Sequence, residues 1–332
     1  MRTVLSVFAS LVLLSAQSSA PKVVALGMSP AEAQALQSEA PGVRIVPARG
    51  PDLARELADA DGVLGTLNPE QFRVAKKLRW MHVYSAGVES ALFPELIDSK
   101  VQVTNAKNVY GPQIADHAFA FLLALTRKLN VTIPNKGKED WPPGRDGMFE
   151  LNGKTAVIIG VGGIGSNIAQ RATGFGMKVI GVDIRDIPPS NTISKVVTPE
   201  RLNEVLPEAD VVFISAPLTA KSAKMMGPQQ FSLLKKGSYY IAVSRGGITD
   251  TGALVKALDE GRLAGAGLDV VDPEPLPKGH PLWKFPNVVI TPHTAGGSDR
   301  LDGRLHAVLL ENLTRFGKNQ PLVNVVDKQA GF

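Results

Sequence analysis

The sequence predicts an α/β protein of two domains, each built on a doubly wound parallel sheet. Short apolar runs that suit strands alternate with helical segments along most of the chain, as in repeated βα units. The length of 332 residues allows two domains of roughly 150 residues each. Near the middle, a strand-like run leads into a G-x-G-x-x-G turn, which is typical of a dinucleotide-binding unit.

The first part of the chain alternates regularly between the two kinds of element. Ser29 and Pro30 supply an N-cap and a first-turn proline for the first helix. We expect strands over residues 22–26, 43–46, 62–66, 80–84 and 101–104. We expect helices between them, over residues 30–38, 51–60 and 69–77.

The fourth of these strands ends in a small turn that contains Ser85, Ala86 and Gly87. Ligands of open α/β sheets bind outside the carboxyl ends of the strands. A glycine-bearing turn at such an end exposes backbone N–H groups to an anion. Ala86 and Gly87 are therefore candidate binders of a substrate carboxylate, and an ordinary βα turn is the alternative.

A long amphipathic helix is expected over residues 113–129, packed between the two domains. His117 lies within this helix and suits a core or interface position better than a catalytic one. Residues 130–148 suit a loop that wraps over the surface or over a partner subunit.

The glycine motif organises the second domain. It follows strand 156–159, precedes helix 166–177, and comprises Gly160, Gly162, Gly163, Ile164 and Gly165. In such motifs the glycines allow a tight turn, the close approach of a pyrophosphate, and close packing of helix on strand. The helix N-terminus then favours the phosphates through its free N–H groups. The motif therefore predicts a dinucleotide cofactor, and a glycine-rich βα turn that binds no ligand is the alternative.

The next strand, over residues 178–183, ends in Asp183, which is 18 residues after Gly165. A carboxylate at this place can accept hydrogen bonds from the adenosine ribose and repels a 2′-phosphate. NAD is therefore favoured over NADP. Arg185, two residues further on, is expected to be a solvated loop charge, and the alternative is that it softens this preference.

Three ionisable residues follow the ends of later strands. We expect these strands over residues 210–215, 239–244, 264–270 and 288–291, with helices over 228–234, 249–260 and 298–316 and an extended tail at 323–326. Arg245, Glu274 and His293 come just after the second, third and fourth of these strands. The three side chains are therefore expected to face the crevice that holds the nicotinamide.

The three residue types form a complete catalytic set. Arg245 can bind a carboxylate through two parallel hydrogen bonds. His293 can exchange a proton with a carbonyl or alcohol oxygen near neutral pH. Glu274 can hold the second ring nitrogen and fix the tautomer.

The composition excludes several classes of function. The net charge is only +5 and no basic cluster occurs, which argues against nucleic-acid binding. The sequence has no cysteine, which excludes disulfides, cysteine-ligated metals and thiol catalysis. We predict no metal site.

Residues 1–20 have the layout of a secretory signal, with a basic start, an apolar run and a small polar end around Ala16-Gln17-Ser18. The apolar run is too short to anchor the chain in a membrane. We therefore expect export, with a cytoplasmic protein as the alternative.

Four ordered motifs resemble those of the D-isomer-specific 2-hydroxyacid dehydrogenases. They are the glycine motif, Ser-Arg-Gly-Gly at 244–247, Gly-Leu-Asp-Val-Val-Asp-Pro-Glu-Pro at 267–275 and Thr-Pro-His-Thr-Ala-Gly at 291–296. The resemblance covers nearly the whole chain after Lys22. It implies a flavodoxin-like substrate domain, residues 21–108 and 297–332, with an inserted Rossmann NAD-binding domain, residues 109–296.

The resemblance also implies roles for single residues. Arg245 would bind the substrate, Glu274 would orient His293, and His293 would act as acid and base. Asp269 would contact the nicotinamide carboxamide, and the residues lining the cofactor cleft would be Ala216, Val243 and Ser244. The turn Ser85–Val88 would bind the substrate carboxylate. Homodimers are usual in the family, with the long helix and the Trp141 loop near the interface.

The sequence departs from the family pattern at three positions. Glu89 stands where Asp is more usual, Asp116 where Glu is more usual, and Ser244 where Ala is more usual. No catalytic group is lost, but the substrate is left open. Because no regulatory domain follows Phe332, we expect a short-form enzyme that reduces glyoxylate, hydroxypyruvate or another 2-keto acid. The alternatives are a non-catalytic NAD-sensing interaction protein and a phosphite or formate dehydrogenase.

Overall fold

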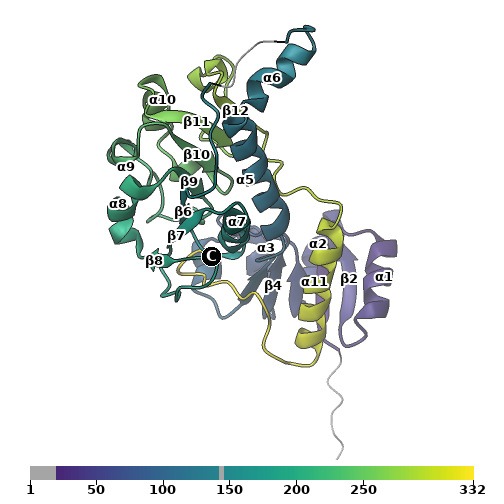
Figure 1. The fold of residues 1–332 in the computed structure, drawn as a ribbon. Coiled ribbons are helices and arrows are strands. Elements are labelled where there is room, and N and C mark those ends of the chain that lie inside the picture. Colours follow the sequence, from purple (N-terminus) through teal and green to yellow (C-terminus); the bar gives the residue numbers. More distant parts are fainter. Residues whose placement is uncertain (1–19, 142–145) are drawn as a thin grey trace, which may run out of the picture.

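The computed structural model describes residues 20–141 and 146–332 (Figure 1). These residues form two lobes, one around a five-stranded sheet and one around a seven-stranded sheet, and the ladders of both sheets are parallel. The expected fold class, two α/β units with parallel sheets, is confirmed. The export signal expected in residues 1–20 lies outside the described residues, apart from Ala20.

The five-stranded lobe has the strand order β2-β1-β3-β4-β5. Its strands are β1 (Lys22–Leu26), β2 (Arg44–Ala48), β3 (Gly62–Leu64), β4 (Trp80–Val83) and β5 (Gln102–Asn105). Its helices before β5 are α1 (Pro30–Glu39), α2 (Leu53–Leu57), α3 (Pro69–Val74) and α4 (Pro94–Ile97). The predicted N-cap of α1 is present, since Ser29 Oγ accepts a hydrogen bond from the Glu32 N–H and Glu32 Oε2 accepts one from the Ser29 N–H.

The end of the chain returns to this lobe. The long helix α11 (Leu301–Gly317) lies beside α1 and β2 in Figure 1. Its apolar face, with Leu313 and Phe316, packs against Val23 and Trp80. After α11, Val325 forms an antiparallel bridge with Thr104 at the edge of the sheet.

The seven-stranded lobe has the order β12-β11-β10-β9-β6-β7-β8. Its strands are β6 (Thr155–Ile159), β7 (Lys178–Val182), β8 (Lys195–Val197), β9 (Val211–Ile214), β10 (Ser238–Ala242), β11 (Leu263–Leu268) and β12 (Val288–Ile290). Its helices after β6 are α7 (Gly163–Gly174), α8 (Leu202–Val205), α9 (Pro228–Leu233) and α10 (Thr251–Asp259). The order reverses between β6 and β9, and in such sheets ligands bind at this reversal.

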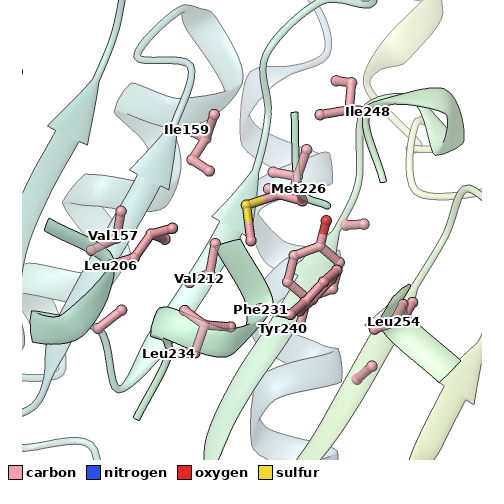
Figure 2. Close-up of a cluster of buried hydrophobic side chains, with 14 of the residues drawn as sticks. Val157, Ile159, Leu206, Val212, Met226, Phe231, Leu234, Tyr240, Ile248 and Leu254 are labelled. Carbon is pink, nitrogen blue, oxygen red and sulfur yellow. The ribbon is translucent and has the colours of Figure 1, made fainter. Parts of the chain in front are cut away.

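A hydrophobic core fills each side of this sheet. On one side, Val212 and Tyr240 of the sheet pack with Met226, Phe231 and Leu254 (Figure 2). On the other side, residues of α5 and α7 cover the sheet, and Phe119 stacks on Phe213. The strands are buried on both faces, which explains why they are continuous apolar runs in the sequence.

Helix α5 (Gly111–Thr126) is the long helix expected between the lobes, and it packs on α7, β10 and β11. The expectation of a loop over residues 130–148 is partly wrong. Residues Leu129–Lys136 form helix α6, which projects from the seven-stranded lobe (Figure 1). The sequence misleads here because Pro134 lies inside α6. A proline inside a helix removes one backbone hydrogen bond, and α6 keeps its helical form despite this loss.

The other expected strands and helices are present, with strand ends that differ by one or two residues. The extended tail expected over residues 323–326 is reduced to the single bridge of Val325, because Asn324 has a left-handed backbone. The short elements β8, α4 and α8 were not expected. Among the residues that the structure describes, no helix is both long and apolar enough to span a membrane.

Candidate active site

Three adjacent strands bring the predicted catalytic residues to one edge of the seven-stranded sheet. Arg245, Glu274 and His293 follow β10, β11 and β12, which pair in this order and run parallel. The loops themselves are in contact, because a Cβ on Gly246 would overlap the carbonyl oxygen of Val271. The expectation that these loops share the carboxyl edge of the sheet is therefore confirmed.

His293 and Glu274 form a direct pair. The imidazole Nδ1 lies 2.7 Å from Glu274 Oε1, and both side chains are half-exposed. With Nδ1–H donating to the carboxylate, the second ring nitrogen, Nε2, is the one available to exchange a proton. His293 has a left-handed backbone (φ 54°), and non-glycine residues in this region are held there by their surroundings.

Asp269 is the residue that holds the His293 turn. Its carboxylate is buried and accepts hydrogen bonds from Thr291 Oγ1 at 2.5 Å, the Thr294 N–H at 2.8 Å and the Ala295 N–H at 3.0 Å. Its backbone carbonyl accepts a hydrogen bond from the His293 N–H at 3.0 Å. Asp269 therefore ties both sides of His293 to the end of β11. The predicted contact with a nicotinamide carboxamide stays a prediction.

His117 of α5 extends this network. Its Nε2 lies 2.9 Å from Thr291 Oγ1, and its ring meets the Phe121 ring edge-on. Because the Thr291 hydroxyl proton points to Asp269, His117 Nε2 is the donor to that hydroxyl. His117 is thus half-buried against the turn that carries His293, which fits the core or interface position expected for it.

The turn after β4 is built to expose its N–H groups. Its carbonyl groups are occupied, since Gly87 O accepts a hydrogen bond from Ser85 Oγ and Ala86 O accepts one from Asn105 Nδ2, each at 2.6 Å. Val88 is buried and anchors the turn. Within residues 20–141 and 146–332, the N–H groups of Ala86 and Gly87 donate no hydrogen bond. These two donors are available to an anion, and their role in binding a substrate carboxylate stays a prediction.

Arg245 reaches across to this turn from the other lobe. Its Nε donates a hydrogen bond to Glu89 Oε1, and its Nη1 donates one to the Ser244 carbonyl at 2.8 Å. A Cβ on Gly87 would overlap Arg245 Nη2, so only glycine lets the guanidinium lie on the turn. The structure thus joins the predicted substrate-binding arginine to the predicted carboxylate-binding turn. The sequence marks Glu89 as a departure from the family pattern but does not indicate that it belongs to the site.

The glycine motif has the geometry that a dinucleotide needs. Gly160 has a positive φ of 91°, and a Cβ there would lie 2.5 Å from Ala216 Cα. A Cβ on Gly165 would overlap the carbonyl oxygen of Gly160, so this glycine allows α7 to pack on β6. Beside Gly162 there is open space, and no side chain caps the N-terminus of α7. The free N–H groups of α7 therefore suit a pyrophosphate.

A second observation supports the fit of a dinucleotide. Ser244 Oγ is buried and has no hydrogen-bond partner in the described part of the chain. Buried polar atoms are normally paired, and an orphan at the end of β10 suits a polar group of a bound ligand. Val243 is buried at the same strand end. Val243, Ser244 and Ala216 could hold one part of a bound dinucleotide, while the glycine motif would hold its pyrophosphate.

Asp183 stands at the end of β7, as expected, but its carboxylate is fully occupied. It accepts hydrogen bonds from the Val161 N–H, the Arg185 N–H, Arg185 Nε and Arg185 Nη2, at 2.8 to 3.0 Å. Burial works against ionisation of Asp183, but the hydrogen bonds from Arg185 and Val161 outweigh it and hold its pKa below the usual range. Arg185 is thus a partner of Asp183 and not a solvated loop charge.

Comparison with known proteins agrees with this geometry. The family model for the NAD-binding domain of D-isomer specific 2-hydroxyacid dehydrogenases matches residues 119–295, more than half of the chain. The protein belongs to this family. A glyoxylate reductase of Korarchaeum cryptofilum is 34% identical to it over 286 residues, which are 83% of this chain and 86% of the relative.

Two solved structures share the whole fold of this chain. A D-lactate dehydrogenase of Aquifex aeolicus, in complex with NAD and lactic acid, is 25% identical, covers 92% of this chain and 99% of its own, and has a TM-score of 0.75. A family member of Xanthobacter autotrophicus, in complex with NADPH and MES, is also 25% identical, covers 95% of this chain and 100% of its own, and has a TM-score of 0.79. Proteins that share this fold thus include one bound to NAD and one bound to NADPH.

Proposed function

We propose that the protein reduces a small 2-keto acid to the D-2-hydroxy acid with a nicotinamide cofactor, and catalyses the reverse oxidation. The family makes it an oxidoreductase, and the hydrogen-bonded His293–Glu274 pair supports acid–base chemistry at the edge where Arg245 stands. Glyoxylate is the first substrate to test, because the relative of Korarchaeum cryptofilum is named a glyoxylate reductase. A protein that only senses NAD would need no such oriented imidazole.

In the proposed reaction, different residues bind the substrate, donate the proton and orient the imidazole. Arg245 and the free N–H groups of Ala86 and Gly87 bind the carboxylate of the keto acid. A bound nicotinamide supplies the hydride to the keto carbon. His293 Nε2 donates the proton to the keto oxygen, and Glu274 stabilises the charged imidazole and keeps Nε2 directed at the site. Closure of the lobes excludes water and aligns the groups.

We infer that NAD(H) is the preferred cofactor. The carboxylate of Asp183 remains at the end of β7, where it disfavours a 2′-phosphate. Arg185 neutralises part of this charge and presents a guanidinium at the same place, so NADP(H) is accepted less well rather than excluded.

We further propose a homodimer that forms through α6. This projecting helix exposes three apolar side chains, Leu129, Val131 and Ile133, and Trp141 follows it almost fully exposed. A second copy of the chain would cover them. Ile133→Glu should shift the mass in light scattering from dimer to monomer. Ile184→Glu, an exposed apolar residue of the seven-stranded lobe, is the matched control, and a monomeric wild type would contradict the proposal.

The activity is tested by the loss of NADH or NADPH absorbance with a panel of 2-keto acids. His293→Gln should lower kcat by at least about 100-fold, because general acid–base catalysis contributes this much. It should leave the Kd for NADH, measured by fluorescence, unchanged. A wild type that reduces none of the keto acids, or a His293→Gln variant with full kcat, would refute the proposed function.

A further inference from the structure

Glu89 lies over the turn to which we assign the substrate carboxylate. Its Oε1 accepts the hydrogen bond from Arg245 Nε, and this ion pair joins the two lobes. Its Oε2 lies 2.6 Å from the position that a Cβ on Gly87 would take, and Arg245 Nη2 fills the same space. The guanidinium and the carboxylate of Glu89 are thus together on Gly87, where the carboxylate of a keto acid is expected.

This ion pair uses donors that the substrate needs. A carboxylate is bound most strongly by two parallel N–H groups from one edge of the guanidinium. On the edge of the guanidinium formed by Nε and Nη2, Glu89 accepts the hydrogen bond from Nε. On the other edge, the Ser244 carbonyl accepts a hydrogen bond from Nη1. A substrate carboxylate must therefore displace Glu89 from Arg245 or bind to Arg245 next to a second negative charge.

We propose that Glu89 is a specificity-determining residue, which competes with the substrate for Arg245 and selects small 2-keto acids with one carboxylate over those with two. The proposal rests on the proposed function, because it assumes that Arg245 binds the substrate carboxylate. A monocarboxylate meets the charge of Glu89 once. A dicarboxylate small enough for the site brings a second negative charge close to the carboxylate of Glu89. Glu89 then repels both charges of the ligand and weakens its binding more.

The exposure of the Arg245–Glu89 ion pair to water limits how strongly Glu89 can change the affinity for a ligand. The side chains of Arg245 and Glu89 are 30% and 37% exposed. Ion pairs with this much contact with water change an equilibrium by less than about fivefold. The Coulomb energy is proportional to the charge of the ligand, so a dianion should respond by about the square of the factor for a monoanion.

Oxamate and oxalate are suitable probes, because they have nearly the same size and shape but carry one and two negative charges. Their Kd values are measured by calorimetry on the NADH-saturated protein. Glu89→Gln should tighten oxamate binding by about two- to fivefold and oxalate binding by about four- to 25-fold. Glu95→Gln is the matched control, since it removes a charge from the surface pair with Arg73 on the same lobe. It should change neither Kd by more than about twofold.

A second variant separates the contact from the charge. Glu89→Asp keeps the negative charge on a side chain that is about 1.5 Å shorter, so it releases Arg245 Nε. It should tighten oxamate binding while oxalate gains less than it does in Glu89→Gln. If Glu89→Gln instead weakens oxamate binding, Glu89 orients Arg245 and does not compete, and the proposal is wrong.

The proposal is equally wrong if Glu89→Gln and Glu95→Gln behave alike. Either result would leave the proposed function intact, provided that the wild type still reduces keto acids. A wild type that binds neither NADH nor oxamate would overturn the proposed function and this proposal together.

Discussion

Replacing Asp269 by Asn tests whether this residue supports the turn that carries His293. The carboxylate accepts three hydrogen bonds, from Thr291 Oγ1 and the N–H groups of Thr294 and Ala295. An amide has one acceptor oxygen, so its best orientation keeps the first two bonds and leaves the buried Ala295 N–H facing an NH₂ group. An unsatisfied buried donor costs about 1–3 kcal/mol, and the two bonds that remain lose their charge assistance. We therefore expect the free energy of unfolding to fall by about 2–4 kcal/mol.

The assay is urea denaturation of wild type and variant, with kcat measured alongside. We expect kcat to fall by about 10- to 100-fold, because the turn that shifts carries His293. Asp259→Asn, at the exposed end of α10, is the matched control and should have neither effect. If Asp269→Asn is as stable as this control and only the Kd for NADH rises, Asp269 is a cofactor ligand and does not hold the turn.

Two further predictions concern charged and titratable groups elsewhere. Arg185→Ala should free Asp183 and remove a donor for a 2′-phosphate, so the Kd ratio of NADPH to NADH should rise by about tenfold or more. Fluorescence titration measures both constants, Arg201→Ala is the control, and an unchanged ratio would contradict the role of Arg185. Burial lowers the pKa of His82 from 6.5 to about 4, so the unfolded chain takes up a proton first as the pH falls. About 3 kcal/mol of stability, fully present above pH 6.5, should be lost by pH 4. His82→Leu should lack this part of the pH dependence, and urea denaturation across this range shows whether it does.

The fold could be predicted from the sequence to the extent that it depends on local signals. The apolar runs of the buried strands, the Ser29 cap and the glycine motif each act within a few residues, and each led to the correct element. Helix α6 was not predicted because it contains Pro134 and buries no apolar face, so its sequence lacks the apolar periodicity of a packed helix. The edge strand β8 was missed because its two valines follow Lys195 and directly precede Thr198 and Pro199, which indicate a turn.

The candidate site was predictable where its residues follow strand ends. The parallel order of β10, β11 and β12 is enough to bring Arg245, Glu274 and His293 to one edge. The ion pair of Glu89 with Arg245 was not predictable, because it depends on how the two lobes face each other. The salt bridge between Arg185 and Asp183 depends on a side-chain rotamer that composition and spacing do not encode.

The path of the chain has a consequence for its synthesis. The core of the five-stranded lobe is incomplete until α11 supplies Leu313 and Phe316, although β5 ends at Asn105. At about 5–20 residues per second, a ribosome needs roughly 10 to 40 s to translate the segment in between. The inserted seven-stranded lobe can therefore fold before α11 is synthesised. During this time the apolar residues of the five-stranded lobe that α11 later covers are available to a chaperone that binds nascent chains.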